Sequence, residues 1–430
     1  MQFENSLEFA RKLDSEDPLK HFKDKFFFPS SNGTDQLYFC GNSLGLQAKT
    51  TKTSIERELE DWANLAVNGH VHAKNPWVSY HKILTKATAK LVGAKPIEVS
   101  TMNGVTVNLN SLFISFYRPT KKRYKIITEH NPFSSDSYLL ENQIKLHGLN
   151  PSKTIIEVKP RKNEFIIRTE DIIDTIKKHE KELALVFFGG VQYYTGQAFD
   201  IKSITSAAHK AGALAGYDLA HATGNIELKL HAWNVDFAAW CTYKYLNAGP
   251  GAVGQLFVHE KYAQAKNLPR LAGWWGHDEK ERFMMKKGFK PMAGAEGWAQ
   301  SNDNVLSMAS LKAALEVFEE AGNKALWGKS RMLTAYLEYL IRTECKADPS
   351  KSSTYKLKII TPSSPKDRGC QLSILVMNGG KKLFDTLIKE NFVVDYRNPD
   401  VIRITPVPLY NSFEDVFKIG NFLKSVCFHE

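Results

Sequence analysis

Between about residue 80 and residue 241 the sequence alternates between short apolar segments and helical stretches. The short segments are rich in β-branched and aromatic residues, as buried parallel strands are, and they span residues 125–127, 183–188, 214–217 and 237–241. Apolar residues recur at helical spacing in the stretches 81–91, 105–116 and 201–211. Strands that alternate with helices predict an α/β fold with a mostly parallel central sheet.

The pattern changes after about residue 305. Two long amphipathic helices are expected first, and then a mixture of strands and helices over 371–376, 381–390, 401–405 and 413–428. This pattern predicts a smaller α+β lobe. We therefore expect an N-terminal arm over residues 1–60 that contributes to the small lobe, a large domain over 61–305 and a small C-terminal domain over 306–430.

Composition narrows the classes of function. Lys and Arg number 57 against 46 Asp and Glu, but the densest basic runs, 121–123 and 286–287, are short and lack the interleaved aromatic residues of a single-strand binder. No apolar stretch approaches the ~20 residues of a membrane span, and residues 1–10 lack the pattern of a signal peptide. We expect a cytoplasmic protein that binds neither nucleic acid nor a membrane.

The cysteines and histidines give little sign of a metal site. The five cysteines are scattered without C-x-x-C spacing, so they are expected to be buried, reduced thiols. His70, His72 and His81 have irregular spacing and no carboxylates among them, which does not favour a metal cluster. No metal is expected.

Chemically distinctive residues follow two of the predicted strands. Asp218 comes directly after the strand 214–217, and Tyr243 and Lys244 come after the strand 237–241. Open α/β folds bind ligands at the carboxyl edge of the sheet, so a carboxylate and an amine are expected to meet there. Asp218 alone could equally be the N-cap of a helix.

A third place opens the helix 105–116 with the loop Asn103–Gly104. The unpaired N–H groups of a helix start and the Thr106 hydroxyl can hold a phosphate, although many helices begin this way. An acid, a lysine and a phosphate seat on one α/β sheet are the groups that an enzyme dependent on pyridoxal phosphate (PLP) uses.

The order of motifs along the chain resembles that of the kynureninase family, fold-type I PLP enzymes close to the class V aminotransferases. The similar segments run across nearly the whole chain: FCGNSLGLQ at 39–47, GH at 69–70, FSSD at 133–136, YTGQ at 194–197, DLAH at 218–221, YKYLNAG at 243–249, GWWGH at 273–277, SN at 301–302, Arg403, and PVPLYNSF at 406–413.

The resemblance implies a role for each matching residue. Lys244 forms the Schiff base with PLP and moves the Cα proton, Tyr243 acts as acid or base, and Asp218 pairs with the pyridinium nitrogen. Arg403 binds the substrate carboxylate, while His70 and Asn302 face the substrate's aromatic ring. The other implied cofactor contacts are Val105, Thr106, Phe133, Ser134, Ser135, Asp136, Gly189 through its backbone, His221 and, from a neighbouring subunit, Trp274 and Asn302.

The sequence departs from the family pattern at two positions. Ala48 stands where the family often has proline, and Gly189 where animal relatives tend to have a serine near the cofactor, so that side-chain hydrogen bond is lost. Some matching residues also have a plainer interpretation. Arg403 could pair with a local acid such as Asp400, and His221 could support the site without acting in it.

The implied protein is a homodimeric hydrolase of tryptophan catabolism and NAD biosynthesis. It would cut the Cβ–Cγ bond of L-kynurenine or 3-hydroxy-L-kynurenine into L-alanine and anthranilate or 3-hydroxyanthranilate. Two alternatives stay open. One is another enzyme on the same fold, an aminotransferase or a cysteine desulfurase with Cys345 or Cys370 as its reactive thiol. The other is a catalytically silent binding protein.

Overall fold

The computed structural model describes residues 2–345 and 355–429. The chain forms two compact units, each assembled from separate stretches of sequence. Unit 1 contains Met1–Thr50, Tyr194–Ala198 and Val317–Glu430, and unit 2 contains Thr51–Tyr193 and Phe199–Glu316. The sequence-based division after residues 60 and 305 stays a prediction.

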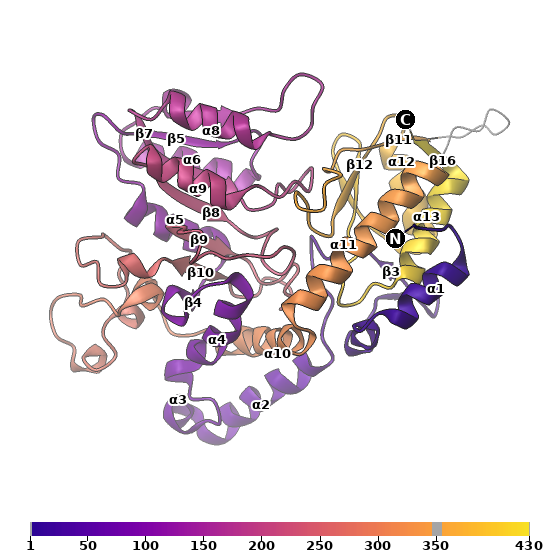
Figure 1. The fold of residues 1–430 in the computed structure, drawn as a ribbon. Helices are drawn as coiled ribbons and strands as arrows, with labels where there is room; N and C mark the ends of the chain where they lie inside the picture. Colours follow the sequence, from indigo (N-terminus) through magenta and orange to yellow (C-terminus); the bar gives the residue numbers. More distant parts are fainter. Residues whose placement is uncertain (1, 346–354, 430) are drawn as a thin grey trace. The chain divides into compact units, whose positions relative to one another are not determined.

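Unit 2 is built on a seven-stranded sheet with the order β4-β10-β9-β8-β7-β5-β6 (Figure 1). Neighbouring strands from β6 to β9 pair in parallel, whereas β10 is antiparallel to both β9 and β4. The predicted mostly parallel sheet is confirmed, but β4, β6 and β10 were missed. The strands are β4 (Val99–Thr101), β5 (Lys125–Glu129), β6 (Ile155–Val158), β7 (Leu183–Gly189), β8 (Leu214–Asp218), β9 (Phe237–Trp240) and β10 (Gln255–Val258).

Helices cover both faces of this sheet. In Figure 1, α8 (Thr169–Lys178) and α9 (Ile201–Lys210) lie in front of the sheet, and α5 (Val105–Phe116) and α6 (Ser134–Leu146) lie behind it. The apolar stripe of α5 is buried against the strands, and Phe116 stacks on Phe237 at 4.9 Å between ring centroids. The other helices are α2 (Thr50–Leu65), α3 (Gly69–His72), α4 (Tyr80–Val92), α7 (Pro151–Thr154) and α10 (Val305–Ala321).

Unit 1 contains a five-stranded sheet with the order β14-β15-β12-β11-β16. Its strands are β11 (Tyr355–Ile359), β12 (Leu372–Val376), β14 (Asp395–Arg397), β15 (Val401–Ile404) and β16 (Cys427–His429). Its helices include α1 (Leu7–Glu16), α11 (Asn323–Tyr339), α12 (Gly380–Lys389) and α13 (Phe413–Val426). Two small strand pairs complete it, β1 (Ser30–Ser31) with β2 (Thr34–Asp35), and β3 (Leu37–Tyr38) with β13 (Phe392–Val393).

One predicted helix is too long. The helix expected over 413–428 ends at Val426, and Cys427–His429 instead forms β16, which pairs in parallel with β11. The apolar run that suggested a continuing helix therefore completes a sheet edge. Among the described residues, no helix is both long and apolar enough to cross a membrane.

Candidate active site

Lys244 lies in the segment that follows β9, and its side chain is only 9% exposed. Its Nζ lies 3.0 Å from His221 Nε2, 5.6 Å from the ring centroid of Phe133 and 5.9 Å from that of Tyr243. The structure thus brings together four residues that the sequence analysis singled out in three separate segments. An amine in such surroundings is largely removed from water, as a nucleophilic lysine must be.

Two buried carboxyl groups lie beside this lysine. Asp218 ends β8 and accepts the N–H of Ala220 at 2.7 Å, and Asp136 lies in the first turn of α6. Burial raises the pKa of both groups, and the neighbouring Asp218 and Glu129 raise the pKa of Asp136 further. Two such groups within hydrogen-bond reach share a proton more readily than they both ionise.

This pair fits the ring nitrogen of PLP. Asp136 Oδ1 is buried and has no hydrogen-bond partner within the part of the chain that the structure describes. A buried acceptor without a donor costs about 1–3 kcal/mol, so a donor is expected there. A protonated pyridine nitrogen would supply both the donor and a compensating positive charge.

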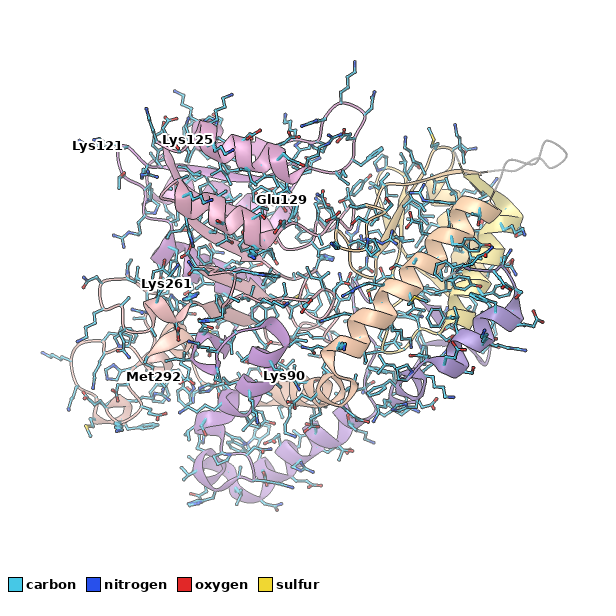
Figure 2. The ribbon with its side chains drawn as sticks, in the orientation of Figure 1. Lys90, Lys121, Lys125, Glu129, Lys261 and Met292 are labelled. Atoms are coloured by element: carbon cyan, nitrogen blue, oxygen red, sulfur yellow. The ribbon has the colours of Figure 1, made fainter. Side chains whose placement is uncertain are left out.

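Glu129 is a third buried carboxyl group, which the sequence reasoning missed. It ends β5 (labelled in Figure 2), and both of its oxygens accept the N–H of Gly189, at 3.0 and 3.1 Å. Burial raises the pKa of Glu129 to about 7, and the charge of Asp218 adds to the effect. Gly189, whose backbone we expected to contact the cofactor, thus donates its N–H to Glu129. The only sign of Glu129 in the sequence was that a polar residue ends a strand.

Two helix starts offer free backbone donors for a phosphate. The N-cap of α5 is Gly104 and that of α6 is Phe133, and neither side chain caps its helix. The first N–H groups of such helices carry partial positive charge. The predicted residues Val105, Thr106, Ser134 and Ser135 lie at these starts, and Thr106 and Ser134 are exposed.

Trp274 and Asn302 form a second group on the surface of unit 2. The Trp274 indole N–H donates to Asn302 Oδ1 at 3.0 Å, and both residues are exposed. The adjacent Asp303 accepts the backbone N–H of His81 at 2.8 Å and its ring Nδ1 at 2.7 Å. His81 Nε2 also lies 3.6 Å from Glu296. His81, which the sequence analysis considered only as a metal ligand, therefore anchors the segment that carries Asn302.

His70 and Arg403 contact residues of this chain that the sequence analysis did not name. Among the described residues, the His70 ring contacts the carbonyl of Val67 and the edge of Trp77, not Asn302. Arg403 lies in β15 of unit 1, is 0% exposed and pairs with Asp395 through Nε at 3.1 Å and Nη2 at 2.8 Å. The local acid is thus Asp395 and not Asp400.

The chain matches two family models. Residues 38–347 match the class V aminotransferases, and residues 326–423 match the kynureninase C-terminal domain. A kynureninase of Flavobacterium psychrophilum is 51% identical over 424 residues, which cover 99% of each chain. The chain belongs to the kynureninase family. A kynureninase of the animal Nematostella vectensis is 48% identical, over 98% of this chain and 94% of that one.

Solved structures show the same fold at low identity. A cystine C–S lyase with glycine linked covalently to its PLP cofactor aligns with a TM-score of 0.74 at 14% identity, over 91% of this chain and 97% of that one. A cysteine desulfurase from Escherichia coli gives 0.72 at 16% identity, over 94% and 97%. The expected PLP fold type I is confirmed. As a kynureninase family member, the chain is a PLP-dependent hydrolytic enzyme.

Proposed function

We propose that this enzyme hydrolyses the Cβ–Cγ bond of L-kynurenine and 3-hydroxy-L-kynurenine. The products are L-alanine and anthranilate or 3-hydroxyanthranilate, in the cytoplasmic tryptophan catabolism that leads to NAD. The observation that carries the proposal is the cluster of Lys244, His221 and the Asp136–Asp218 pair at the carboxyl edge of the sheet. This cluster lies in a chain 51% identical, from end to end, to a relative named kynureninase.

The acid and the base of the reaction come from this cluster. PLP, when bound, supplies an electron sink for the negative charge that develops at the substrate Cα. Lys244 would hold the cofactor covalently and would carry the proton at the substrate Cα. Asp218, supported by Asp136, keeps the ring nitrogen protonated. Burial raises the pKa of Tyr243, so its phenol keeps its proton near neutral pH and would donate a hydrogen bond to the substrate carbonyl oxygen.

Residues at the starts of α5 and α6 are proposed to provide the remaining cofactor contacts. The N–H groups of Val105 and Thr106 and the Thr106 hydroxyl bind the phosphate, and Ser134 and Ser135 add the donors of α6. The Phe133 ring lies 5.6 Å from Lys244 Nζ and would stack on the cofactor ring. His221 positions the lysine amine at 3.0 Å.

Substrate binding involves Arg403, His70 and Asn302. The bidentate pair with Asp395 holds the Arg403 guanidinium in a fixed orientation, which favours recognition of a planar carboxylate. Because Arg403 is 0% exposed, a substrate carboxylate can reach it only if one of the residues that cover it moves. His70 and Asn302 provide polar atoms for the substrate's aromatic ring.

A second copy of the chain completes the site. Apolar side chains are unusually exposed along residues 271–289, with Phe283, Met284 and Met285 each at least 60% exposed. Large exposed apolar patches mark interaction sites. The same stretch carries Trp274, so we assign Trp274 and Asn302 to the cofactor site of the partner in a homodimer.

Mixing the inactive Lys244→Ala chain with an Asn302→Ala chain of reduced activity tests this shared site. Lys244→Ala and Asn302→Ala chains, unfolded together and refolded as a 1:1 mixture, give hybrid dimers with one intact site if Asn302 acts across the interface. Roughly a quarter of wild-type activity then returns, since half of the dimers are hybrids with one working site of two. No recovery in hybrids that hold PLP would mean that each chain builds its own site.

Product analysis tests the reaction itself. The purified holoenzyme is incubated separately with L-kynurenine and 3-hydroxy-L-kynurenine, and chromatography follows alanine and the aromatic acid. Equal amounts of alanine and anthranilate support hydrolysis. A 2-oxo acid without alanine would identify an aminotransferase, and no turnover of either substrate would contradict the proposal.

The desulfurase alternative requires a reachable thiol. Cys345 is 0% and Cys370 1% exposed, and burial raises the pKa of Cys370 far above its usual range. A buried, protonated thiol is a poor nucleophile. The two cysteines that the sequence left open thus favour hydrolysis over desulfuration. Incubation with L-cysteine and a sulfide assay provides the direct comparison.

A further inference from the structure

Glu58 is a buried carboxyl group that no step of the proposed reaction uses. It lies in α2 and is only 1% exposed, although glutamate is rarely buried so completely unless its oxygens are paired. Oε1 accepts Asn75 Nδ2 at 2.8 Å and the Tyr80 hydroxyl at 3.0 Å. Oε2 accepts the indole N–H of Trp77 at 3.2 Å. The carboxyl group therefore connects α2 to the segment that leads into α4.

The partners of Glu58 all present hydrogens to it. An indole N–H and a side-chain amide N–H can only donate, so both require an acceptor when they are removed from water. Burial raises the pKa of Tyr80, and the charge of Glu58 adds to the effect, so the phenol keeps its proton and donates a hydrogen bond. A glutamine in place of Glu58 could not accept all of these bonds, because only one of its two terminal atoms is an acceptor.

The far side of the Trp77 indole lies directly on the backbone of Gly69. Gly69 has right-handed helical backbone angles, so its conformation does not require glycine. A Cβ at this position would lie 2.3 Å from Trp77 Cη2 and 2.6 Å from both Cζ2 and Cζ3, which is closer than packed carbon atoms approach. The glycine of the GH motif at 69–70 thus makes room for the six-membered ring of Trp77.

His70, the next residue, also contacts Trp77. Its ring lies edge-on to the indole, with 5.4 Å between ring centroids and 74° between their planes. Its Nδ1 lies 3.0 Å from the carbonyl oxygen of Val67. A carbonyl oxygen can only accept, so Nδ1 carries the hydrogen, and Nε2 of the neutral ring is an acceptor. The Val67 carbonyl and the indole together fix the direction in which Nε2 points.

We propose that Glu58 is a positioning residue for recognition of the substrate's aromatic ring and acts through Trp77 on His70. The inference rests on the proposed function, in which His70 faces that ring. Glu58 holds the indole, and the indole holds the Gly69–His70 turn, so Nε2 can accept the 3-hydroxyl of 3-hydroxy-L-kynurenine. L-Kynurenine has no hydroxyl there, so a displaced His70 penalises only the hydroxylated substrate.

The substitution Glu58→Gln tests the proposal through the ratio of two kcat/KM values. Both kynurenines are assayed with the same preparation of holoenzyme, so any loss of folded protein cancels in the ratio. The preference for 3-hydroxykynurenine, roughly tenfold in wild type, should fall to roughly threefold or less, while the value for L-kynurenine changes little. A purely structural role would lower both values together and leave the ratio unchanged.

Two further variants test the route through Trp77. Trp77→Phe removes the N–H that Glu58 accepts and the outer ring that contacts Gly69, so the same fall in the ratio is expected. This variant also serves if Glu58→Gln does not fold. In a His70→Phe background, Glu58→Gln should change the ratio no further, because residues that act through one contact are not additive. A second, additional fall would contradict the route through His70.

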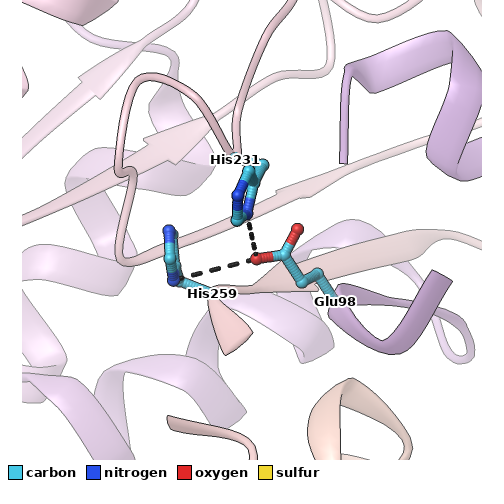
Figure 3. Close-up of side chains that lie close together, drawn as sticks. All are labelled: Glu98, His231 and His259. Carbon is cyan, nitrogen blue, oxygen red and sulfur yellow. Dashed lines mark hydrogen bonds and ion pairs between the residues drawn. The ribbon is translucent and has the colours of Figure 1, made fainter. Parts of the chain in front are cut away.

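Glu98→Gln is the matched control. The Glu98 side chain is also completely buried, and its Oε1 lies 2.9 Å from His231 Nδ1 (Figure 3). Its oxygens also accept the backbone N–H groups of Lys95 at 2.7 Å and Glu260 at 2.9 Å. These partners lie outside the segment 58–80. Glu98→Gln should therefore lower the thermal midpoint but keep the wild-type ratio.

A binding measurement separates this inference from the proposed reaction. Calorimetry compares the dissociation constants of anthranilate and 3-hydroxyanthranilate on each holoenzyme, which needs no turnover. A reduced preference for the hydroxylated compound in Glu58→Gln, and not in Glu98→Gln, supports the inference. An unchanged preference in both Glu58→Gln and Trp77→Phe, an equal fall in the control, or a wild type without a preference overturns it. Absence of alanine release from wild type would contradict the proposed hydrolysis alone, and the binding ratio would still decide the role of Glu58.

Discussion

His81 forms pH-dependent ion pairs close to Asn302. The substitution His81→Asn measures how much these ion pairs stabilise the fold. The ring of His81 bonds Asp303 at 2.7 Å and lies 3.6 Å from Glu296, and its side chain is only 7% exposed. Burial lowers the pKa of His81, but the two carboxylates more than offset this and raise it from 6.5 to about 9. Asparagine can keep the bond from the Nδ1 position but carries no charge.

The magnitude follows from the shift in pKa. A rise from 6.5 to about 9 corresponds to about 3 kcal/mol of stability, at 1.36 kcal/mol per pKa unit. The raised value means that the folded state holds the proton more tightly than the unfolded state. The contribution is therefore complete below pH 6.5 and is lost as the pH rises through about 9. The same contact holds the pKa of Glu296 below its usual value despite burial.

The assay compares thermal midpoints of wild type and His81→Asn between pH 6 and pH 9.5. We expect a large difference at pH 6 that shrinks steadily toward pH 9.5, with the effects of all other groups common to both proteins. Cofactor affinity at pH 7 should fall in the variant if Asp303 positions Asn302. Two curves that stay parallel over the whole pH range would refute the reasoning, because the difference would then not involve a proton on His81.

Four further outcomes are expected at the candidate active site. Lys244→Ala should lose the covalent link to PLP, so borohydride reduction followed by mass spectrometry should find no labelled peptide. Asp218→Asn should retain PLP but lose activity roughly a hundredfold, and near-normal turnover would contradict the ring-nitrogen role. Glu129→Gln keeps an acceptor for the Gly189 N–H but cannot ionise, so a step near pH 7 should disappear from the pH titration of the cofactor absorbance. Wild type should prefer 3-hydroxykynurenine roughly tenfold in kcat/KM, and the double variant His70→Trp, Asn302→Thr should flatten or reverse that ratio.

The residues that the sequence analysis expected at one edge of the sheet, and that the structure brings together, share one property. Asp218, His221 and Lys244 each lie within a few residues of the end of a buried strand, and strand periodicity is visible in a short window of sequence. Because parallel strands end at a common edge, the local pattern sufficed to predict that the lysine and the carboxylate meet. Phe133 and Asp136 came from the family resemblance, since the start of a helix has no comparable signal.

The residues that were missed depend on contacts between distant segments. Glu129 is held by the N–H of Gly189, which belongs to a different strand, and His81 is held by Asp303, which lies in a different part of the chain. Neither partner can be inferred from spacing in the sequence. Buried polar groups must find hydrogen bonds, but the sequence does not say which atoms provide them until the strands and helices have been assembled.

The partner of Arg403 shows how strand geometry overrides proximity in sequence. Asp400 is three residues away and seemed the natural acid, but it lies in the turn before β15, where its Oδ1 accepts the N–H of Gly380 at 3.2 Å. Asp395 is farther along the chain, yet the antiparallel pairing of β14 with β15 places it directly opposite Arg403, on the same face. Both oxygens of Asp395 then bond the guanidinium, and Arg397 adds a second positive charge at 2.9 Å. This charge surplus of two arginines over one carboxylate supports the proposed role of Arg403 in binding a substrate carboxylate.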